Sequence, residues 1–373
     1  MYPILEIDLG KLEHNAREIV KRCKARGIEV AGVIKGCSGI PECAAAIARG
    51  GCAYLASSRL GQLEAARRHG VELPFMMIRI PMLSEAAEVV RVTEVSLNSE
   101  AATLRRLHEE AGKQGRVHKV ILMAELGDLR EGVWDRRELL ELALRTENEW
   151  KNLTLQGIGT NLGCYGSIAP TVEKMEELVR LAEEVERAIG RKLAVVSGGA
   201  STSFPRVMDE NMPARVNSLR IGENILFGRD LKDLWGYDTH FLHSDVFVLK
   251  AEIIEVKTKP SHPVGEITFD AFRNRPAYTD RGLRRRALAA IGRVDYAWTE
   301  QILPRDAGVT VLGASSDHTI LDIEEARRDF IVGDVVEFEL CYGPAVFLSH
   351  DPDVRVVFTG GGNTPAPLSG EER

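Results

Sequence analysis

The run AGVIKGCSG places a lysine, Lys35, at the end of a buried apolar segment. An ammonium group there must be paired or must lose its water, and both cost free energy. Burial favours the neutral amine, which can condense with a carbonyl compound to form a Schiff base. The alternative is a lysine whose head reaches out of the fold into solvent. Lys35 alone leaves these two interpretations evenly balanced.

Further polar groups follow later apolar runs. Arg130 lies in GDLREG and Asn161 in GIGTNLG, and the segment SGGASTS ends with Ser201, Thr202 and a third hydroxyl. Hydroxyl groups beside a row of backbone N–H groups are typical of an anion-binding loop. Each segment alone is weak evidence, because most glycine- and serine-rich loops are only loops.

Eight short apolar runs alternate with amphipathic segments between Leu9 and about Phe227. The runs are Val30–Lys35, Tyr54–Ser58, Phe75–Ile80, Thr93–Asn98, Lys119–Leu126, Leu155–Leu162, Ala194–Gly199 and Ser218–Leu226. Continuous apolar runs are typical of parallel strands covered on both faces. The clearest predicted helices are Lys11–Arg26, Ser99–Lys113, Asp135–Arg145 and Thr171–Ile189. Eight such units predict an α/β fold, a (β/α)8 TIM barrel. An open doubly wound sheet is the alternative, but no GxGxxG follows the first strand.

In a parallel barrel the active site forms at the carboxyl ends of the strands, and phosphate is often bound after the seventh and eighth. Lys35 follows the first predicted strand, the SGGASTS segment follows the seventh, and Gly222 lies beside the end of the eighth. A glycine there lets a phosphate approach the backbone. A lysine and a phosphate loop on one rim predict a phosphorylated aldehyde cofactor, pyridoxal phosphate.

After Tyr237 the pattern changes to short runs rich in β-branched residues, which predict a mostly β domain. These runs are Phe247–Thr258, Gly308–Leu312, Thr319–Ile323, Asp334–Leu340 and Val354–Phe358, with one helix expected over Ile323–Asp329. We therefore expect an N-terminal strand at 1–9 packing with the β domain, the barrel at 10–236, the β domain at 237–360 and a disordered tail at 361–373.

Several segments together resemble one known family. In chain order they are VIKGCSG, GDLREG, GIGTNLGCYG, SGGASTS, NSLRIGENILFG, AIGRVD, GASSDHTILD and ELCYGP. The chain resembles the alanine racemase-like, fold-type III pyridoxal phosphate enzymes over nearly its whole length, and most of all their ornithine/lysine racemase branch. This resemblance implies a racemase (an isomerase) that interconverts the L and D forms of an amino acid, either a basic one or a broad range. It also implies a head-to-tail homodimer with shared active sites.

The resemblance also assigns roles by position. Lys35 would bond to the cofactor and act as one acid/base group. Arg220 would face the pyridine nitrogen, and Arg130 would approach the phenolic oxygen or the substrate carboxylate. Asn161 stands where alanine racemases carry a histidine. The phosphate would be held by Ser201, Thr202, the backbone N–H groups of Gly222 and Glu223, and Tyr342.

The chain departs from alanine racemases at the second acid/base group. Those enzymes carry a tyrosine in an IGYADG-like segment, whereas this chain has IGRVDY with Arg293 in that place. Arginine is a poor base because it keeps its proton in proteins. Gly39 likewise replaces a tyrosine near the cofactor lysine. The candidates for the second group are Tyr296, Asp295, Asp317, His318 and Ser316, and a one-base route through Lys35 is the alternative.

The segment GASSDHTILD replaces the bulkier segment that narrows the alanine pocket. Ser315 and Ser316 are small and leave space, and the carboxylate of Asp317 could pair with a distal ammonium group. A turn-forming aspartate is the alternative interpretation of Asp317. Space beside a carboxylate favours a long, basic amino acid as the substrate.

Composition narrows the remaining classes. The 48 lysines and arginines against 55 aspartates and glutamates give a net charge of −7, without the basic character expected of a nucleic-acid partner. No apolar run of about 18 residues predicts a membrane span, and the N-terminus does not resemble a signal peptide. Six cysteines without a CxxC pair predict reduced thiols in the cytoplasm and no metal site.

Two other function classes stay open. A non-catalytic pyridoxal phosphate carrier resembles only the barrel, so the β domain argues against it. Another fold-type III activity, such as a decarboxylase, a D-threonine aldolase or a D-serine dehydratase, is the second. The metal-assisted members of that group need His and Cys ligands, and Cys341 and His350 form no clear pairing.

Overall fold

The computed structural model describes residues 1–361, and the chain divides into two compact units. One unit is Leu12–Leu242, and the other joins Met1–Lys11 to His243–Arg373. The second unit thus begins at 243, whereas the sequence pattern placed its start at 237. The predicted tail lies, except for its first residue, outside the described residues. No helix within residues 1–361 is long and apolar enough to cross a membrane.

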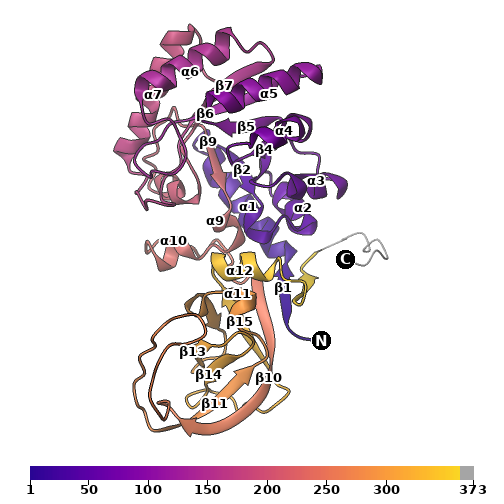
Figure 1. Ribbon diagram of the computed structural model, residues 1–373, viewed down its shortest axis with the longest axis vertical. Coiled ribbons are helices and arrows are strands. Elements are labelled where there is room, and N and C mark those ends of the chain that lie inside the picture. The colour runs from indigo at the N-terminus through magenta and orange to yellow at the C-terminus, as the bar shows by residue number, and fades with distance from the viewer. Residues whose placement is uncertain (362–373) are drawn as a thin grey trace. The chain divides into compact units, whose positions relative to one another are not determined.

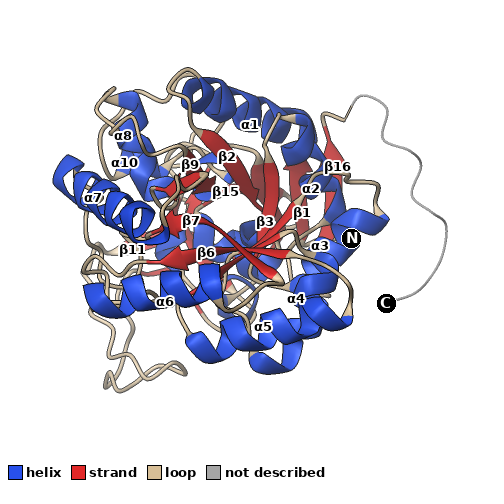
Figure 2. Cartoon of the chain, turned by 90° about the horizontal axis from the view of Figure 1, so that it is seen from above, coloured by secondary structure: helices blue, strands red, loops and turns tan. Residues whose placement is uncertain are grey.

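The first unit is the predicted (β/α)8 barrel, closed by eight strands in the order β2 to β9. The strands are β2 (Glu29–Val33), β3 (Tyr54–Ser57), β4 (Phe75–Met77), β5 (Val95–Asn98), β6 (His118–Met123), β7 (Leu153–Gly159), β8 (Val195–Ser197) and β9 (Ser218–Ile221). All neighbouring pairs are parallel, and β2 pairs with β9 to close the ring. Figure 2 shows the helices surrounding the strands. The larger ones are α1 (Leu9–Lys24), α2 (Pro41–Arg49), α3 (Leu60–Arg68), α4 (Ala86–Val92), α5 (Ala101–Lys113), α6 (Arg136–Asn148) and α7 (Val172–Ile189).

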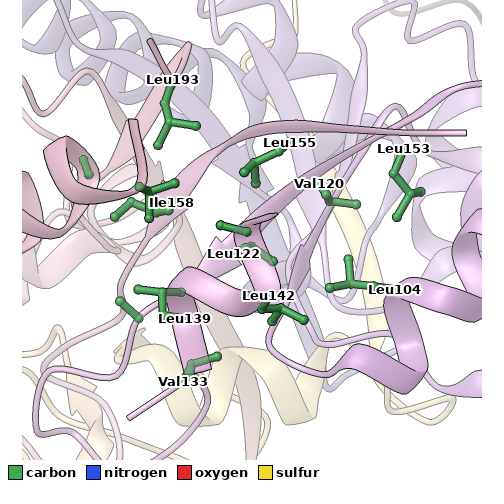
Figure 3. Close-up of a cluster of buried hydrophobic side chains, with 14 of the residues drawn as sticks. Leu104, Val120, Leu122, Val133, Leu139, Leu142, Leu153, Leu155, Ile158 and Leu193 are labelled. Carbon is green, nitrogen blue, oxygen red and sulfur yellow. The ribbon is translucent and has the colours of Figure 1, made fainter. Parts of the chain in front are cut away.

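The continuous apolar strands are explained by burial on both faces. Along β6, Val120 and Leu122 pack into the cluster between strands and helices (Figure 3), whereas Ile121 and Met123 belong to a separate cluster formed mainly by other strand residues. Side chains of a strand point alternately to its two faces, so both faces of this strand are apolar because both are covered.

The eighth barrel strand is shorter than predicted. It ends at Ile221, and Glu223–Leu226 form the short helix α9 instead of continuing the strand. The N–H groups of Ile225 and Leu226 donate to the carbonyl oxygen of Gly222, which turns the backbone away from the sheet. The prediction failed because a buried helix turn is as apolar as a buried strand.

The second unit contains an eight-stranded sheet (Figure 1). Six strands follow the order β12-β15-β10-β11-β14-β13, and β1 pairs antiparallel with β10 and parallel with β16. Its strands are β1 (Ile4–Asp8), β10 (Phe247–Pro260), β11 (Leu283–Ala289), β12 (Ile302–Pro304), β13 (Thr310–Ala314), β14 (Thr319–Asp322), β15 (Val335–Leu340) and β16 (Arg355–Thr359). Two short helices, α11 (Arg293–Tyr296) and α12 (Tyr342–Leu348), accompany it.

Several features of the second unit differ from the sequence expectation, among them strand β12, which was not predicted. Strand β11 was not predicted, because it contains the arginine triplet at 284–286. Its charged side chains are paired: Arg284 Nε lies 2.9 Å from Asp322 Oδ2, and Arg285 Nη1 lies 2.7 Å from Asp329 Oδ1. The predicted helix Ile323–Asp329 is wrong, since Asp322 Oδ1 accepts the N–H of Glu324 at 3.1 Å and the segment forms turns.

Candidate functional site

The predicted barrel residues follow carboxyl ends of strands, except Arg220, which lies within β9. Lys35 begins a 3-10 turn after β2, Arg130 follows β6, and Asn161 follows β7. Ser201 and Thr202 lie in the 3-10 turn after β8, and Gly222 and Glu223 follow β9. Because the strands are parallel and the barrel is closed, these positions share one rim.

The amine of Lys35 is partly buried and electrostatically unusual. Burial lowers the pKa of this amine, and the neighbouring guanidinium of Arg130 lowers it further. Cys164 and Glu131 act in the opposite direction, without reversing the shift. The environment therefore makes the neutral, nucleophilic form of Lys35 more accessible than it is for an exposed lysine.

Arg220 is a buried cation, with 4% of its surface exposed. Its Nη2 donates to the carbonyl oxygen of Thr160 at 2.8 Å, and its Nη1 donates to Ser197 Oγ. Burial lowers the pKa of its guanidinium to about 10. Within residues 1–361 no carboxylate forms an ion pair with it, so the guanidinium can accommodate an electron-rich group of a ligand.

The loop after β8 is built around Ser201. Its hydroxyl oxygen accepts the N–H of Gly222 at 3.2 Å, which joins this loop to the end of β9. Gly199 has a φ of 113°, a conformation that favours glycine. Thr202 Oγ1 donates to the carbonyl oxygen of Leu162 at 2.7 Å, so its one hydroxyl proton is already engaged. Its predicted contact with an anion stays a prediction.

Glu223 follows Gly222, and its carboxyl group is buried and has a raised pKa. Its Oε1 is buried and without a hydrogen-bond partner in the described part of the chain. Burial raises the pKa of Glu223, and the carboxyl of Asp230 raises it further. A neutral Glu223 would not repel an anion bound at the neighbouring backbone.

Arg130 contacts two residues, Glu131 and Cys164, that the sequence analysis did not assign to the site. Its Nη1 lies 2.8 Å from Cys164 Sγ, and its Nε and Nη2 contact the carboxylate of Glu131. Glu131 is adjacent in sequence and so could have been suspected. Cys164 comes from a different loop, after β7, and only the fold brings it to Arg130.

The candidate residues in the second unit differ in how buried they are. Tyr296 is fully buried, its hydroxyl lies 2.7 Å from Thr319 Oγ1, and burial raises the pKa of its phenol to about 12. This placement argues against an acid/base role and for a packing role. Asp295 accepts the N–H of Gly292 at 2.8 Å, and burial, with Asp351 beside it, raises the pKa of its carboxyl.

Arg293 faces a cavity of about 580 Å³ within the second unit. Its guanidinium carbon lies 4.2 Å from the ring centre of Phe272, its Nη1 lies 3.9 Å from Asp270 Oδ2, and Ser315 also lines this cavity. Asp317 is exposed, whereas Ser316, His318 and Tyr342 are partly buried. These side chains belong to the second unit and the Lys35 group to the first.

Comparison with known proteins places this arrangement in a family. The family model for the alanine racemase N-terminal domain matches residues 7–230. The chain belongs to the alanine racemase family. It is 37% identical over 343 residues to an ornithine racemase of Acetoanaerobium sticklandii, covering 92% of this chain and 96% of that protein.

Two further relatives extend the comparison. A lysine racemase of Thermotoga maritima is 37% identical over 358 residues, covering 96% of this chain and 99% of that protein. The solved alanine racemase of Bartonella henselae with covalently bound pyridoxal phosphate has a TM-score of 0.73 at 15% identity, covering 96% of this chain and 100% of that one. At this identity the structural match establishes the shared fold, barrel and β domain included.

Proposed function

We propose that this protein is a pyridoxal phosphate-dependent racemase of a basic amino acid, ornithine or lysine. The proposal rests on Lys35, a partly buried lysine at the barrel rim. The chain that carries it is 37% identical to an ornithine racemase and to a lysine racemase across both units. A broad substrate range that includes these amino acids is the wider form of the proposal.

The barrel rim offers each group that pyridoxal phosphate requires. Lys35 is a partly buried amine with a lowered pKa, suited to covalent bonding with an aldehyde. A hydrogen bond joins Ser201 to Gly222, and a Cβ on Gly222 would come 3.0 Å from Val33 Cβ, so a side chain here would crowd β2. Arg220 offers a buried guanidinium without an anionic partner among the described residues. The residues therefore fit the cofactor.

When bound, pyridoxal phosphate supplies an aldehyde and an electron-withdrawing ring that together acidify the Cα–H bond of an attached amino acid. Lys35, once its amine is free and neutral, accepts or returns the proton at Cα on its own side. Arg220 would face the ring nitrogen and oppose its protonation, because two cations in contact repel each other. An unprotonated ring would withdraw electrons less strongly, which would suit simple return of a proton to Cα.

Racemisation also requires a proton to reach the opposite side of Cα. Asp317, His318, Ser316 and Asp295 stay candidates for this second group, and Lys35 serving both sides is the alternative. Arg130 would bind the substrate carboxylate or the phenolic oxygen, and Asn161 would line the same rim. We propose that Ser201 and the N–H groups of Gly222 and Glu223 hold the phosphate, and the assignment of Tyr342, which lies in the second unit, stays a prediction.

The substrate's distal ammonium group needs an acidic partner. We propose Asp317, because it is exposed and follows the small residues Ser315 and Ser316. The same residues would belong to the partner subunit's site in a head-to-tail homodimer, which we propose as the active assembly. The six cysteines, all within residues 1–361, form no disulfide bond, and we propose a location in the reducing cytoplasm.

Chiral chromatography tests this proposal directly. The protein loaded with pyridoxal phosphate is incubated separately with the L and D forms of ornithine, lysine, alanine, serine and threonine. We expect ornithine or lysine to approach equal amounts of the two forms without a change in mass, and Lys35→Ala to abolish this. Release of carbon dioxide, ammonia or an aldehyde would instead indicate a decarboxylase, a dehydratase or an aldolase. Binding of the cofactor without turnover of any amino acid would indicate a carrier.

A further inference from the structure

The guanidinium of Arg130 is held on two sides. Its Nη1 donates to Cys164 Sγ at 2.8 Å, while its Nε and Nη2 donate to the two carboxylate oxygens of Glu131. A guanidinium is planar, so contacts at three of its donors fix both its position and its plane. Glu131 neighbours Arg130 in the chain and would follow its movements. Cys164 lies on a separate loop, so its sulfur can hold the guanidinium independently of the segment that carries Arg130.

The loop that carries Cys164 is itself anchored. The carboxylate of Asp128, which is fully buried, accepts the N–H groups of Cys164 at 3.2 Å, Tyr165 at 3.0 Å and Ile168 at 3.3 Å. Although burial raises it, these backbone donors lower the pKa of Asp128 on balance, so the anchor is ionised at neutral pH. The backbone of Cys164 is thus held by hydrogen bonds to a buried carboxylate.

The position of Arg130 matters to Lys35. After burial, the charge of Arg130 is the largest influence lowering the pKa of the Lys35 amine, and Cys164 is the largest opposing one. A guanidinium that swings away would change the field at the amine and also leave the rim. The group that holds Arg130 therefore affects the reactive lysine without bonding to it.

We propose that Cys164 is a positioning residue of the active site, whose sulfur holds the Arg130 guanidinium beside Lys35. The inference rests on the proposed function of this rim. It has a chemical consequence: alkylation of the exposed Cys164 thiol adds bulk at the sulfur and displaces the Arg130 guanidinium. With iodoacetamide a carbon–sulfur bond forms, iodide leaves, and the thiol proton passes to solvent.

Selective modification is feasible because the other cysteines are less accessible. Cys23, Cys37, Cys43 and Cys52 are buried, and Cys341 is only partly exposed, whereas Cys164 is exposed. Limited iodoacetamide should therefore label Cys164 first, as peptide mass mapping can verify. Because Cys164 lies on the rim with Lys35, saturating pyridoxal phosphate should slow this labelling.

A double-mutant cycle tests the positioning role. The dissociation constant of pyridoxal phosphate, followed by absorbance, and kcat/KM are measured for the wild type, Cys164→Ala, Cys164→Ser, Arg130→Ala and the Cys164→Ala/Arg130→Ala double variant. We expect Cys164→Ala to weaken at least one of these constants about tenfold, as for one charge-assisted hydrogen bond. Cys164→Ser should retain most of the wild-type value because its hydroxyl can also accept. In the Arg130→Ala background the Cys164 substitution should have no further effect.

The outcomes separate this inference from the proposed function. A tenfold loss that persists unchanged in the Arg130→Ala background, or wild-type constants in Cys164→Ala, would overturn the positioning role while leaving the cofactor lysine in place. Absence of any adduct at Lys35 in the wild type would overturn the proposed function itself. Urea unfolding of each variant verifies that it is folded, and Cys164→Ala should no longer respond to iodoacetamide.

Discussion

Lys35 combines two properties that oppose each other in an ordinary lysine. Its amine lies at the barrel rim, where it can bond to a ligand, and it is also partly buried. Burial and the guanidinium of Arg130 lower the pKa of this amine. A surface lysine near its ordinary pKa of about 10.4 would be almost entirely protonated at neutral pH and a poor nucleophile. Burying an amine that is protonated in the unfolded chain lowers the free energy of unfolding of the cofactor-free protein.

That cost predicts a pH-dependent stability difference between the wild type and Lys35→Met, both without cofactor. Because the folded-state pKa of Lys35 is lowered, the unfolded chain binds more protons between that value and about 10.4. The free energy of unfolding of the wild type should therefore rise with pH relative to Lys35→Met, by about 1.4 kcal/mol for each unit of lowering. Urea unfolding at several pH values from 6 to 10 measures this. Parallel pH profiles would contradict the burial of the amine.

Tyr296 illustrates the opposite situation, a candidate residue that is enclosed by the fold. We expect Tyr296→Phe to lower the free energy of unfolding by about 1 kcal/mol, the contribution of its hydrogen bond with Thr319. Racemisation should stay within about twofold of wild type, since one buried hydrogen bond far from solvent is changed. Chiral chromatography with urea unfolding measures both. A hundredfold loss of turnover in a folded variant would restore Tyr296 as the second acid/base group.

Among the structural elements, β2 contacts the end of β9 at Gly222, in the loop that we propose to bind the phosphate. Gly222 lies so close to Val33 that a new Cβ would stand 3.0 Å from Val33 Cβ and 3.1 Å from Val33 O. The Gly222 N–H also joins the loop of Ser201. Any outward movement here separates the two segments that we assign to the phosphate.

Gly222→Ala tests that contact. We expect pyridoxal phosphate to bind at least about tenfold more weakly, and the free energy of unfolding to fall by about 1–3 kcal/mol through overpacking. Gly61→Ala is the matched control: Gly61 lies in α3 with nothing within 4 Å of a new Cβ, so helix propensity predicts equal or slightly greater stability. Absorbance titration and urea unfolding measure the two effects. Unchanged cofactor affinity in Gly222→Ala would place the phosphate elsewhere.

Helices and strands could be predicted from the sequence where a pattern of apolar residues is compatible with only one type of element. Eight buried apolar runs alternating with amphipathic segments specified the barrel, and the strand ends then indicated Lys35 as a candidate, whereas Arg220 was assigned through the family resemblance. The pattern failed where two structures share it: Glu223–Leu226 is apolar enough for a strand but forms α9. Arg284–Arg286 form part of β11, which pairs with β10 and β14, and the carboxylates that Arg284 and Arg285 contact, Asp322 and Asp329, are distant in sequence. Cys164 joined the site through a loop contact that no local pattern encodes.

For the whole molecule, the proposed head-to-tail homodimer explains why acid/base candidates such as Asp317 occur on a unit other than the one carrying Lys35. We expect light scattering to give twice the mass of one chain, and racemase activity per chain to fall on dilution below the dimer dissociation constant. Activity that is independent of dilution in a sample shown to be monomeric would contradict shared active sites.

The covalent bond at Lys35 is the central claim, and borohydride reduction tests it most directly. The protein is saturated with pyridoxal phosphate, reduced, digested and mapped by mass spectrometry, with Lys35→Ala treated in parallel. We predict one stoichiometric phosphopyridoxyl adduct, on the peptide that contains Lys35, and none at that peptide in the variant. A colourless protein without an adduct, or a stoichiometric adduct on another lysine, would contradict the account.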